Sequence, residues 1–493
     1  MLSRSVKAGV LAFGKLIASL SGMFCFAALT RLLDETEYAT YRQALLVYMT
    51  TAPVLVMGLS QALYYFLPRE PERGRALVLE NMLPLLATGA LFFLFLVAGG
   101  NQLIASAYNN DQLAVVLLVF APYALAVLPL SSFEASLVIN NRVRDVTIFT
   151  ILSRLLFVAL VVGAAWWWQT ALPAVAGAVI ASAVVLPIGL WLLFRAVPEG
   201  GWRPDWSSVR RQFIYAIPLG LATMVSGLAQ QVDKTIVAVM SNPETFAVFA
   251  NGATELYFIG ILTGSVTAVL LPDATRALKA GNQAEALRLW KSAAAKTALI
   301  VMPVFFSLLV FAVFFIEIVF SKKYPDSVVP FRIYLFILPL RIVVFSALLM
   351  AANRTRWVLW GSIGMLVSNL ILSIPFVYWL GPNGAAVATI VTFYGWIVPF
   401  YLIGIRQVVD TTWAEILPWP AFLRTTTVCL VPTLVCYVVL KLGWLPGNPF
   451  FGLPIGMAVF GGILLALYWS FGFVHPRDIL AHASQLWTKE PRT

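Results

Sequence analysis

Long apolar runs recur along the whole chain, and they constrain its fold more than any other feature of the sequence. Many of them reach about 18 residues or more, enough for an α-helix to cross the ~30 Å hydrocarbon layer of a membrane. The chain is 60% hydrophobic and only 11% charged, whereas soluble domains carry about 25% charged residues. Lipid must therefore solvate most of its surface, and we predict an all-α polytopic membrane protein. A transmembrane β-barrel would instead show ~10-residue segments of alternating hydrophobicity.

Fourteen spans account for these runs, and the basic residues test that number. Short cytoplasmic loops collect Lys and Arg, and most of the 33 Lys and Arg residues fall in every second connection, beginning with the N-terminus. We therefore expect both termini in the cytoplasm, a retained first span rather than a signal peptide, and a place in the cytoplasmic (inner) membrane. Five basic residues fall in the segments expected outside: Arg31, Arg42, Lys322, Lys323 and Lys441. The expected spans are 8–32, 44–67, 77–98, 113–139, 146–168, 173–195, 212–240, 246–271, 296–320, 328–352, 357–380, 384–405, 424–441 and 451–472.

Several other functions find no support in the sequence. The net charge of +11 requires no nucleic-acid partner, because the basic loops would face anionic membrane lipids. Cys25, Cys429 and Cys436 lie in apolar runs without a CxxC or a His/Cys cluster, so we expect no disulfide, no metal site and no cofactor. A G-x-x-x-x-G-K-[ST] loop for nucleotide phosphates is also missing from the sequence. These features favour a transporter over an enzyme.

The sequence contains an internal duplication. "LLDETEYATYRQALLV" from Leu32 and "VMSNPETFAVFANGATEL" from Val239 share an aromatic-Ala-x-aromatic pattern at a shift of 208 residues, and three further matches follow in order at shifts of 204 to 210. Such a repeat predicts two six-helix lobes around a central cleft, related by an axis along the membrane normal. We expect an N-terminal lobe at 1–198 (spans 1–6), a C-terminal lobe at 199–406 (spans 7–12), and an appended two-helix hairpin with a cytoplasmic tail at 407–493.

Two segments resemble a known family. "TRLLDETEYATYRQALLV" from Thr30 resembles the segment after the first span in bacterial oligosaccharide flippases of the Wzx or polysaccharide-transporter type. Two glycines common in that family are replaced here by Asp34 and Ala39. "QQVDKTIVAVM" from Gln230 is similar to the family's seventh span, in which an Asp is followed by Arg or Lys. The family belongs to the multidrug/oligosaccharidyl-lipid/polysaccharide exporter superfamily.

The resemblance implies a flippase for cell-surface polysaccharide assembly, such as that of lipopolysaccharide or exopolysaccharide. Its substrate would be an isoprenoid-pyrophosphate-linked oligosaccharide, moved across the cytoplasmic membrane by alternating access. A proton or sodium gradient, or the substrate itself, would drive turnover. A multidrug extruder and a lipid II flippase of the same superfamily are the nearest alternatives. An integral-membrane glycan polymerase or ligase is a weaker one, because such enzymes usually carry a large outer loop, and a non-transporting scaffold is another.

Seven ionisable side chains lie well inside the expected spans, where each costs ~2.5–3.5 kcal/mol on insertion scales and usually faces a cavity or a partner. Arg341 and Glu255 fall near mid-depth. A pyrophosphate must be compensated while it crosses, and the planar guanidinium of Arg suits it. We predict that Arg341 and Arg154 contact the anion, with Lys15 and Lys234 next. Glu255 or Asp233 would carry the coupling ion. The full set is Lys15, Glu134, Arg154, Asp233, Lys234, Glu255 and Arg341.

Each of these residues also has a structural interpretation. Lys15 and Lys234 are close enough to the ends of their spans to reach the membrane surface with their long side chains. Glu134 would pair with Arg142 or Arg154, and Asp233 would neutralise a neighbouring cation. Sugar hydroxyls need amide or aromatic partners, for which Gln230 is the candidate within the resembling segment, with others at Gln61, Tyr64, Asn251, Asn369 and Tyr394.

Overall fold

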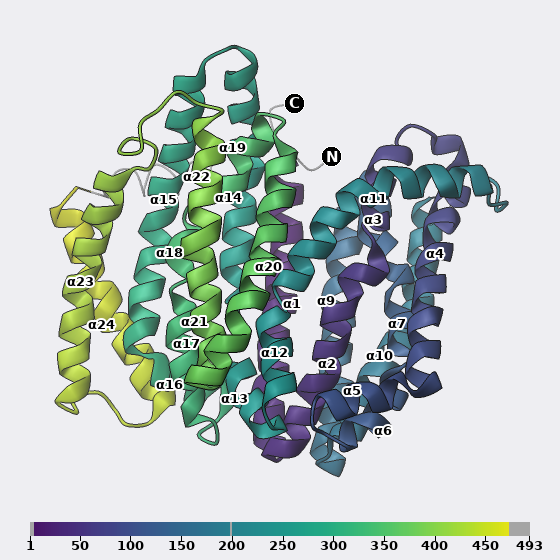
Figure 1. Cartoon of the computed structure of the whole chain (residues 1–493), viewed down its shortest axis with the longest axis horizontal. Coiled ribbons are helices and arrows are strands. Elements are labelled where there is room, and N and C mark those ends of the chain that lie inside the picture. The colour runs from purple at the N-terminus through teal and green to yellow at the C-terminus, as the bar shows by residue number, and fades with distance from the viewer. Residues whose placement is uncertain (1–3, 198–199, 473–493) are drawn as a thin grey trace.

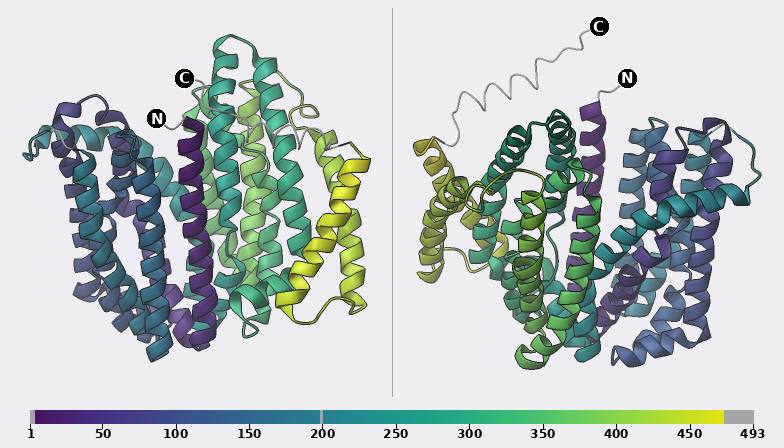
Figure 2. Two further views of the ribbon diagram at one scale, coloured as in Figure 1. Left: turned by 180° about the vertical axis from the view of Figure 1, so that it is seen from behind. Right: turned by 45° about the horizontal axis from the view of Figure 1, so that its top comes forward.

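The structure is a computed structural model that describes residues 4–197 and 200–472. Every regular element in these ranges is a helix, so the predicted fold class is confirmed for the described residues. The helices α2 to α10 gather on one side and α12 to α22 on the other, with α1 at their junction and the hairpin α23–α24 at one edge (Figures 1 and 2). We call the end of the bundle where α1 begins the proximal end, and the other the distal end.

The first lobe contains α1 (Arg4–Leu32), α2 (Glu35–Val56), α3 (Leu59–Phe66), η1 (Pro71–Arg73), α4 (Gly74–Phe95), η2 (Leu96–Gly100), α5 (Asn101–Ala107), α6 (Gln112–Phe120), α7 (Tyr123–Val127), η3 (Pro129–Ser132), α8 (Phe133–Ile139), α9 (Val143–Trp168) and α10 (Ala171–Ala196). Within this lobe, α9 packs most extensively on α1 and α10.

The second lobe contains α11 (Trp206–Ala229), α12 (Val232–Met240), α13 (Pro243–Gly252), α14 (Tyr257–Lys279), α15 (Gln283–Val310), α16 (Ala312–Phe320), η4 (Pro325–Ser327), α17 (Val328–Leu335), α18 (Leu338–Arg341), α19 (Phe345–Ala351), α20 (Thr355–Leu380), α21 (Asn383–Thr392), η5 (Phe393–Ile397) and α22 (Val398–Arg406). The hairpin of α23 (Trp419–Lys441) and α24 (Pro449–Ser470) packs on α15 and α16.

The number of spans agrees with the sequence. Thirteen helical segments in the described residues are long and apolar enough to cross a membrane, and a fourteenth is formed if the arms Trp206–Pro218 and Gly220–Ala229, bent by 48°, count as one span. Exposed aromatic side chains stand at both ends of the bundle, as expected for residues at membrane–water interfaces. They are Trp202, Trp206, Trp413 and Trp419 at the proximal end and Trp166, Trp167, Trp168, Tyr378, Trp379 and Trp444 at the distal end.

Several spans expected to be continuous are interrupted. The span expected at 212–240 divides into the bent α11 and the shorter α12, with Gln230 and Gln231 between them. The span expected at 246–271 divides into α13 and α14, because residues 253–256 are not helical. A third interruption separates α18 from α19. Apolar composition predicts that a segment lies in the membrane, but it does not reveal where the helix breaks inside it.

The duplication is visible in the helix caps. Asp34 caps α2 by accepting a hydrogen bond from Glu37 N at 2.7 Å, and Asn242 caps α13 by accepting one from Thr245 N at 2.9 Å. The two capping residues are 208 positions apart, which is the shift read from the sequence. A carboxylate or amide at this position satisfies a backbone N–H that the first helical turn leaves unpaired. The two halves therefore begin this helix with the same local chemistry.

The lobes meet at the distal end through α2 and α13, and we call this region the α2–α13 contact. Three hydrogen bonds cross it. Thr36 Oγ1 donates to Glu244 Oε1 at 2.6 Å, Tyr38 OH donates to Asn251 Oδ1 at 2.7 Å, and Arg42 Nη2 donates to Ala250 O at 2.9 Å.

Two of the five basic residues in the segments expected outside the membrane, Arg31 and Lys323, are bonded to helix ends. Arg31 donates to the carbonyl of Ile318 at 2.6 Å, near the end of α16, and Lys323 donates to the Leu33 carbonyl at 3.2 Å, just past the end of α1. Cations are stabilised at helix C-termini, where the last carbonyls lack partners. This bonding gives a physical reason for part of the departure from the charge rule.

At the proximal end, α11 crosses between the lobes and packs on α3 and α4 as well as on α20 (Figure 1). Gly58, with φ of 70°, lies against Gly220 at this crossing. A Cβ added to Gly58 would lie 2.5 Å from Gly220 Cα, and one added to Gly220 would overlap the Met57 carbonyl. Only glycine on both helices allows their backbones to approach this closely.

Candidate functional site

The candidate site is a cavity of about 110 Å³ between the lobes, directly behind the α2–α13 contact. A second hollow of about 450 Å³ adjoins it and shares Met49, Gln230 and Gln231 with it. The cavity is lined by Phe26, Arg42, Leu45, Leu46, Met49, Gln230, Gln231, Lys234, Phe246, Ala250, Ala253, Thr254 and Glu255. Three residues predicted from the sequence, Gln230, Lys234 and Glu255, therefore come together here. Gln61, a candidate for sugar hydroxyls, lines the second hollow.

Broken helices line this cavity. Gln230 and Gln231 lie in the break before α12, and Ala253, Thr254 and Glu255 lie in the break before α14. Inside a membrane, non-helical backbone is tolerated only where it is buried in protein or lines a cavity, because lipid cannot satisfy its polar groups. The breaks thus place polar backbone and side chains where a polar solute could meet them.

Arg341 and Glu255 form an ion pair that joins the break before α14 to the break after α18. Arg341 Nη2 lies 3.4 Å from Glu255 Oε1, and the side chains are 38% and 43% exposed. Arg341 ends α18, just before the third interruption. That interruption is held in place by Trp290, whose Nε1 donates to the Val344 carbonyl at 3.0 Å. The pair makes one nitrogen–oxygen contact and is open on its other sides, so the guanidinium retains donors for a further anion.

Lys234 turns back into the protein rather than toward the distal surface. Its Nζ lies 3.3 Å from the Gln230 carbonyl, 3.7 Å from Asp233 Oδ1 and 5.8 Å from the centre of the Tyr334 ring. The side chain is 16% exposed and lines the cavity. The adjacent Asp233 is 3% exposed, and its second carboxylate oxygen, Oδ2, is bonded to Thr389 of α21.

Asp233 belongs to a buried cluster of oxygen-bearing side chains. Its Oδ2 accepts a hydrogen bond from Thr389 Oγ1 at 3.3 Å, and Asn369 Nδ2 donates to the same hydroxyl at 3.0 Å. Ser373 donates to Asn369 Oδ1 at 2.7 Å. Asn369 is therefore a partner in this cluster, not one of the residues that line the cavity. A carboxylate, an amide and hydroxyls are the ligand types that small hard cations prefer.

Lys15 and Glu134, two of the ionisable residues singled out in the sequence, form an ion pair in the first lobe. Lys15 Nζ lies 2.7 Å from Glu134 Oε1, with both side chains about half exposed. The expectation that Glu134 pairs with Arg142 or Arg154 was wrong, and Arg142 lies near Asp145 instead, at 3.7 Å. Sequence spacing had favoured the arginines because they are near Glu134 in the chain, whereas α1 brings Lys15 from 119 residues away.

Arg154 lies between α1 and α9. Its Nε donates to the Ala18 carbonyl at 3.4 Å, and its guanidinium lies 5.2 Å from the centre of the Phe157 ring. Within the described ranges, no carboxylate lies within ion-pair distance of it. Arg154 and Lys15 do not line the cavity that holds Lys234 and Glu255, so their predicted contact with a substrate stays a prediction.

Sequence reasoning missed Arg42. It was assigned to an outer loop because the second span was expected to begin at residue 44, whereas α2 begins at Glu35. Arg42 is therefore about two turns inside the helix. The polar stretch 35–43 concealed the helix start, although Asp34 followed by Glu37 is a recognisable capping signal.

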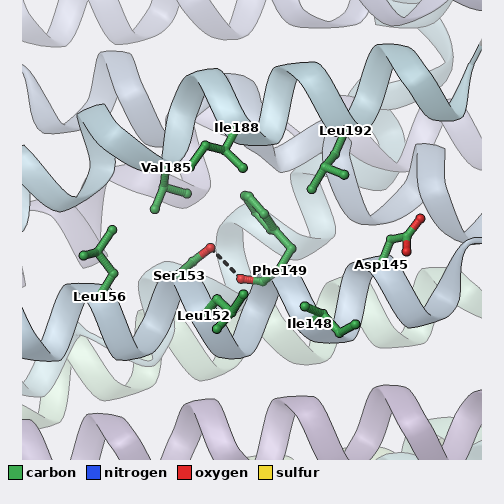
Figure 3. A pocket seen from close by; sticks show the side chains of 9 residues that line it. All are labelled: Asp145, Ile148, Phe149, Leu152, Ser153, Leu156, Val185, Ile188 and Leu192. Atoms are coloured by element: carbon green, nitrogen blue, oxygen red, sulfur yellow. Dashed lines mark hydrogen bonds between the residues drawn. The ribbon is translucent and has the colours of Figure 1, made fainter.

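A separate hollow of about 200 Å³ lies between α9 and α10 (Figure 3). Apolar side chains dominate its lining, including Leu152, Leu156 and Ile188. The hydroxyl of Ser153 is already bonded to the Phe149 carbonyl at 2.5 Å, as Figure 3 shows. With Asp145 as its charged residue, this hollow offers no cation to a pyrophosphate, and we do not include it in the site.

Comparison with known proteins identifies the family. Residues 6–278, more than half of the chain, match the family described as polysaccharide biosynthesis protein. The chain belongs to this family. Among curated proteins, none matches the sequence.

Solved structures show which fold the family member adopts. The chain is similar to the lipid II flippase MurJ in an inward closed conformation, with a TM-score of 0.73 at 16% identity over 95% of this chain and 99% of that one. It is also similar to an inward-facing multidrug resistance MATE transporter of the MOP superfamily, with a TM-score of 0.62 at 14% identity over 79% and 94%. A third is a MOP superfamily transporter from Pyrococcus furiosus, with a TM-score of 0.59 at 14% identity over 83% and 96%. At these identities the likeness establishes a shared fold.

Proposed function

We propose that this family member is a flippase that moves an isoprenoid-pyrophosphate-linked oligosaccharide across the cytoplasmic membrane, with both termini in the cytoplasm. The observation that carries the proposal is the cavity between the lobes, which is lined by Arg42, Lys234 and the amides of Gln230 and Gln231. It is also lined by Glu255, the ion-pair partner of Arg341. Cations at this depth are costly unless they serve a partner or a substrate. Pyrophosphate supplies the charge that would compensate them, and amides suit sugar hydroxyls.

The arrangement of the lobes supports alternating access. The α2–α13 contact joins the lobes on the distal side of the cavity, while α11 and the Gly58–Gly220 crossing join them at the proximal end. Rocking of two repeat-related lobes about such contacts would expose a fixed site to each side in turn. Under the proposed orientation, the distal end faces outward.

The Asp233 cluster supports a role for a coupling ion. A proton or Na⁺ bound at Asp233 would weaken the attraction of its carboxylate for Lys234, whose Nζ is 3.7 Å away. Lys234 would then be freer to meet an anion in the cavity that it lines. Because Asp233 contacts the buried cluster and Lys234 lines the cavity, the pair would in this manner link the ion to the substrate.

The balance of charge disfavours an extruder of organic cations. The cavity lining holds two cations, Arg42 and Lys234, and one carboxylate, Glu255, which is already paired with Arg341. Organic cations would be repelled by the excess positive charge. Lipid II is itself a lipid-linked pyrophosphate saccharide, so a lipid II flippase would use the same cation chemistry and is distinguished by its sugar.

A reconstituted transport assay tests the proposal. The protein is incorporated into vesicles with a fluorescent oligosaccharide linked to polyprenyl pyrophosphate, and label on the outer leaflet is quenched chemically over time. We expect protein-dependent movement between leaflets that ceases when the saccharide lipid lacks its pyrophosphate. Transport of organic cations instead, with no movement of the lipid-linked sugar, would show the proposal to be wrong.

A further inference from the structure

Arg42 belongs both to the α2–α13 contact and to the cavity behind it. Its Nη2 donates to the Ala250 carbonyl at 2.9 Å, across the lobes, and its Nη1 lies 3.2 Å from Tyr38 OH on its own helix. The guanidinium also lies 4.4 Å from the centre of the Phe26 ring, and the side chain lines the cavity together with Lys234 and Glu255. Of the four side chains that form these bonds on α2 and α13 together with Arg42, namely those of Thr36, Tyr38, Glu244 and Asn251, none lines that cavity, whereas Ala250, which accepts through its backbone carbonyl, does.

The positive charge of Arg42 is held by dipoles and not by a carboxylate. Ala250 is near the end of α13 (Pro243–Gly252), where the helix dipole presents partial negative charge. Within the described ranges, no Asp or Glu lies within ion-pair distance of Arg42. Its partners at the contact are thus a carbonyl and a phenol. These neutral acceptors bind a guanidinium more weakly than two anionic phosphate oxygens that accept two parallel hydrogen bonds from it.

We propose that Arg42 couples anion binding in the cavity to opening of the α2–α13 contact. A pyrophosphate in the cavity accepts hydrogen bonds from Arg42 in the bidentate geometry that Arg favours. The guanidinium then leaves the Ala250 carbonyl, and the contact loses the one of its three bonds that a cation donates. Two neutral-donor bonds, from Thr36 and Tyr38, remain to hold the lobes together. This inference rests on the proposed function for the class of its ligand.

A distance across the contact provides the test. Spin labels are attached at Glu35→Cys on α2 and Thr245→Cys on α13, positions whose side chains form none of the three bonds. The native cysteines are buried. The probe is geranylgeranyl pyrophosphate, and geranylgeraniol, which lacks the anion, is the control ligand. Binding of the radiolabelled probe is measured on the same preparations.

With Arg42 present, we expect the pyrophosphate probe to lengthen the distance and the alcohol to leave it unchanged. In Arg42→Ala the distance should be long from the start and insensitive to the probe, with affinity for the probe lower by roughly 10- to 150-fold. Arg42→Lys should respond partially, because it keeps the charge but loses the planar fork. Arg31→Ala is the matched control, since Arg31 also bonds to distal carbonyls but does not line the cavity. It should keep the full response.

The outcomes separate this inference from the proposed function. If Arg42→Ala still lengthens the distance when the probe binds, or if the protein with Arg42 binds the probe without any change in distance, Arg42 does not couple the two events and the flippase proposal stands. If the protein with Arg42 does not bind the pyrophosphate probe at all, the proposed function fails and the inference fails with it.

Discussion

Thr36 and Glu244 are 208 residues apart and hydrogen-bond to each other at 2.6 Å across the two lobes. Because 208 is also the shift of the duplication, each residue contacts its own repeat equivalent. Arg42 and Ala250, which are bonded at 2.9 Å, have the same separation. Equivalent positions of two related units can touch only near the axis that relates them. The α2–α13 contact therefore lies near the pseudo-symmetry axis of the molecule, with one lobe on each side of it.

The alternation of basic loops predicts which side of the membrane each connection faces. We expect Thr245→Cys to react with a membrane-impermeant maleimide in intact cells, and Gln283→Cys to react only after the membrane is permeabilised. The buried native cysteines provide a low background. Reaction of Gln283→Cys in intact cells would reverse the proposed orientation.

Asp233→Asn should abolish the dependence of transport on an ion gradient and leave binding of the lipid-linked substrate measurable. The reason is that its carboxylate is the charged member of the buried cluster with Thr389 and Asn369. Glu255→Gln, at the cavity, should affect substrate affinity more than ion dependence. Gradient-driven flux and binding are measured in the same vesicles. Normal gradient dependence in both variants would exclude an ion site at either residue.

Arg341→Ala should nearly abolish export while the protein still inserts, because its pair with Glu255 is open and not buried. Arg341→Lys should retain part of the activity, since it keeps the charge without the fork. The loss of one charge-assisted hydrogen bond, about 1.5–3 kcal/mol, corresponds to roughly a 10- to 150-fold weaker substrate affinity. Export is assayed beside the amount of protein in the membrane. Disappearance of Arg341→Ala from the membrane would indicate a structural role, and normal export would exclude both roles.

Gly220→Ala should lower the thermal stability of the detergent-solubilised protein, because the added Cβ would overlap the Met57 carbonyl. Gly264→Ala is the matched control on α14, where an added Cβ has nothing within 4 Å. It should be neutral or stabilising by roughly 0.5–1 kcal/mol, since alanine loses less backbone entropy than glycine in a helix. Retention of folded protein is followed by size exclusion after heating. Equal stability of the two variants would show that the α3–α11 crossing tolerates a wider spacing.

The sequence by itself determined the class of the protein, and it predicted fourteen spans and an internal duplication. These properties depend on local composition and on periodic patterns, which do not change when distant segments are rearranged. The resemblance carried by the segments at Thr30 and Gln230 also led to the family that the comparison establishes.

Only the tertiary structure decided where the spans break and which charges meet. The interruption before α19 depends on Trp290, 54 residues away, and Glu134 pairs with Lys15, 119 residues away, in place of the nearby arginines. The local pattern predicts a loop at Arg42, whereas α2 places this residue between the α2–α13 contact and the cavity. A helix break in a membrane is stable only if distant groups satisfy its backbone, and an ion pair forms only where folding brings both partners together. Neither condition is written in the local pattern of the chain.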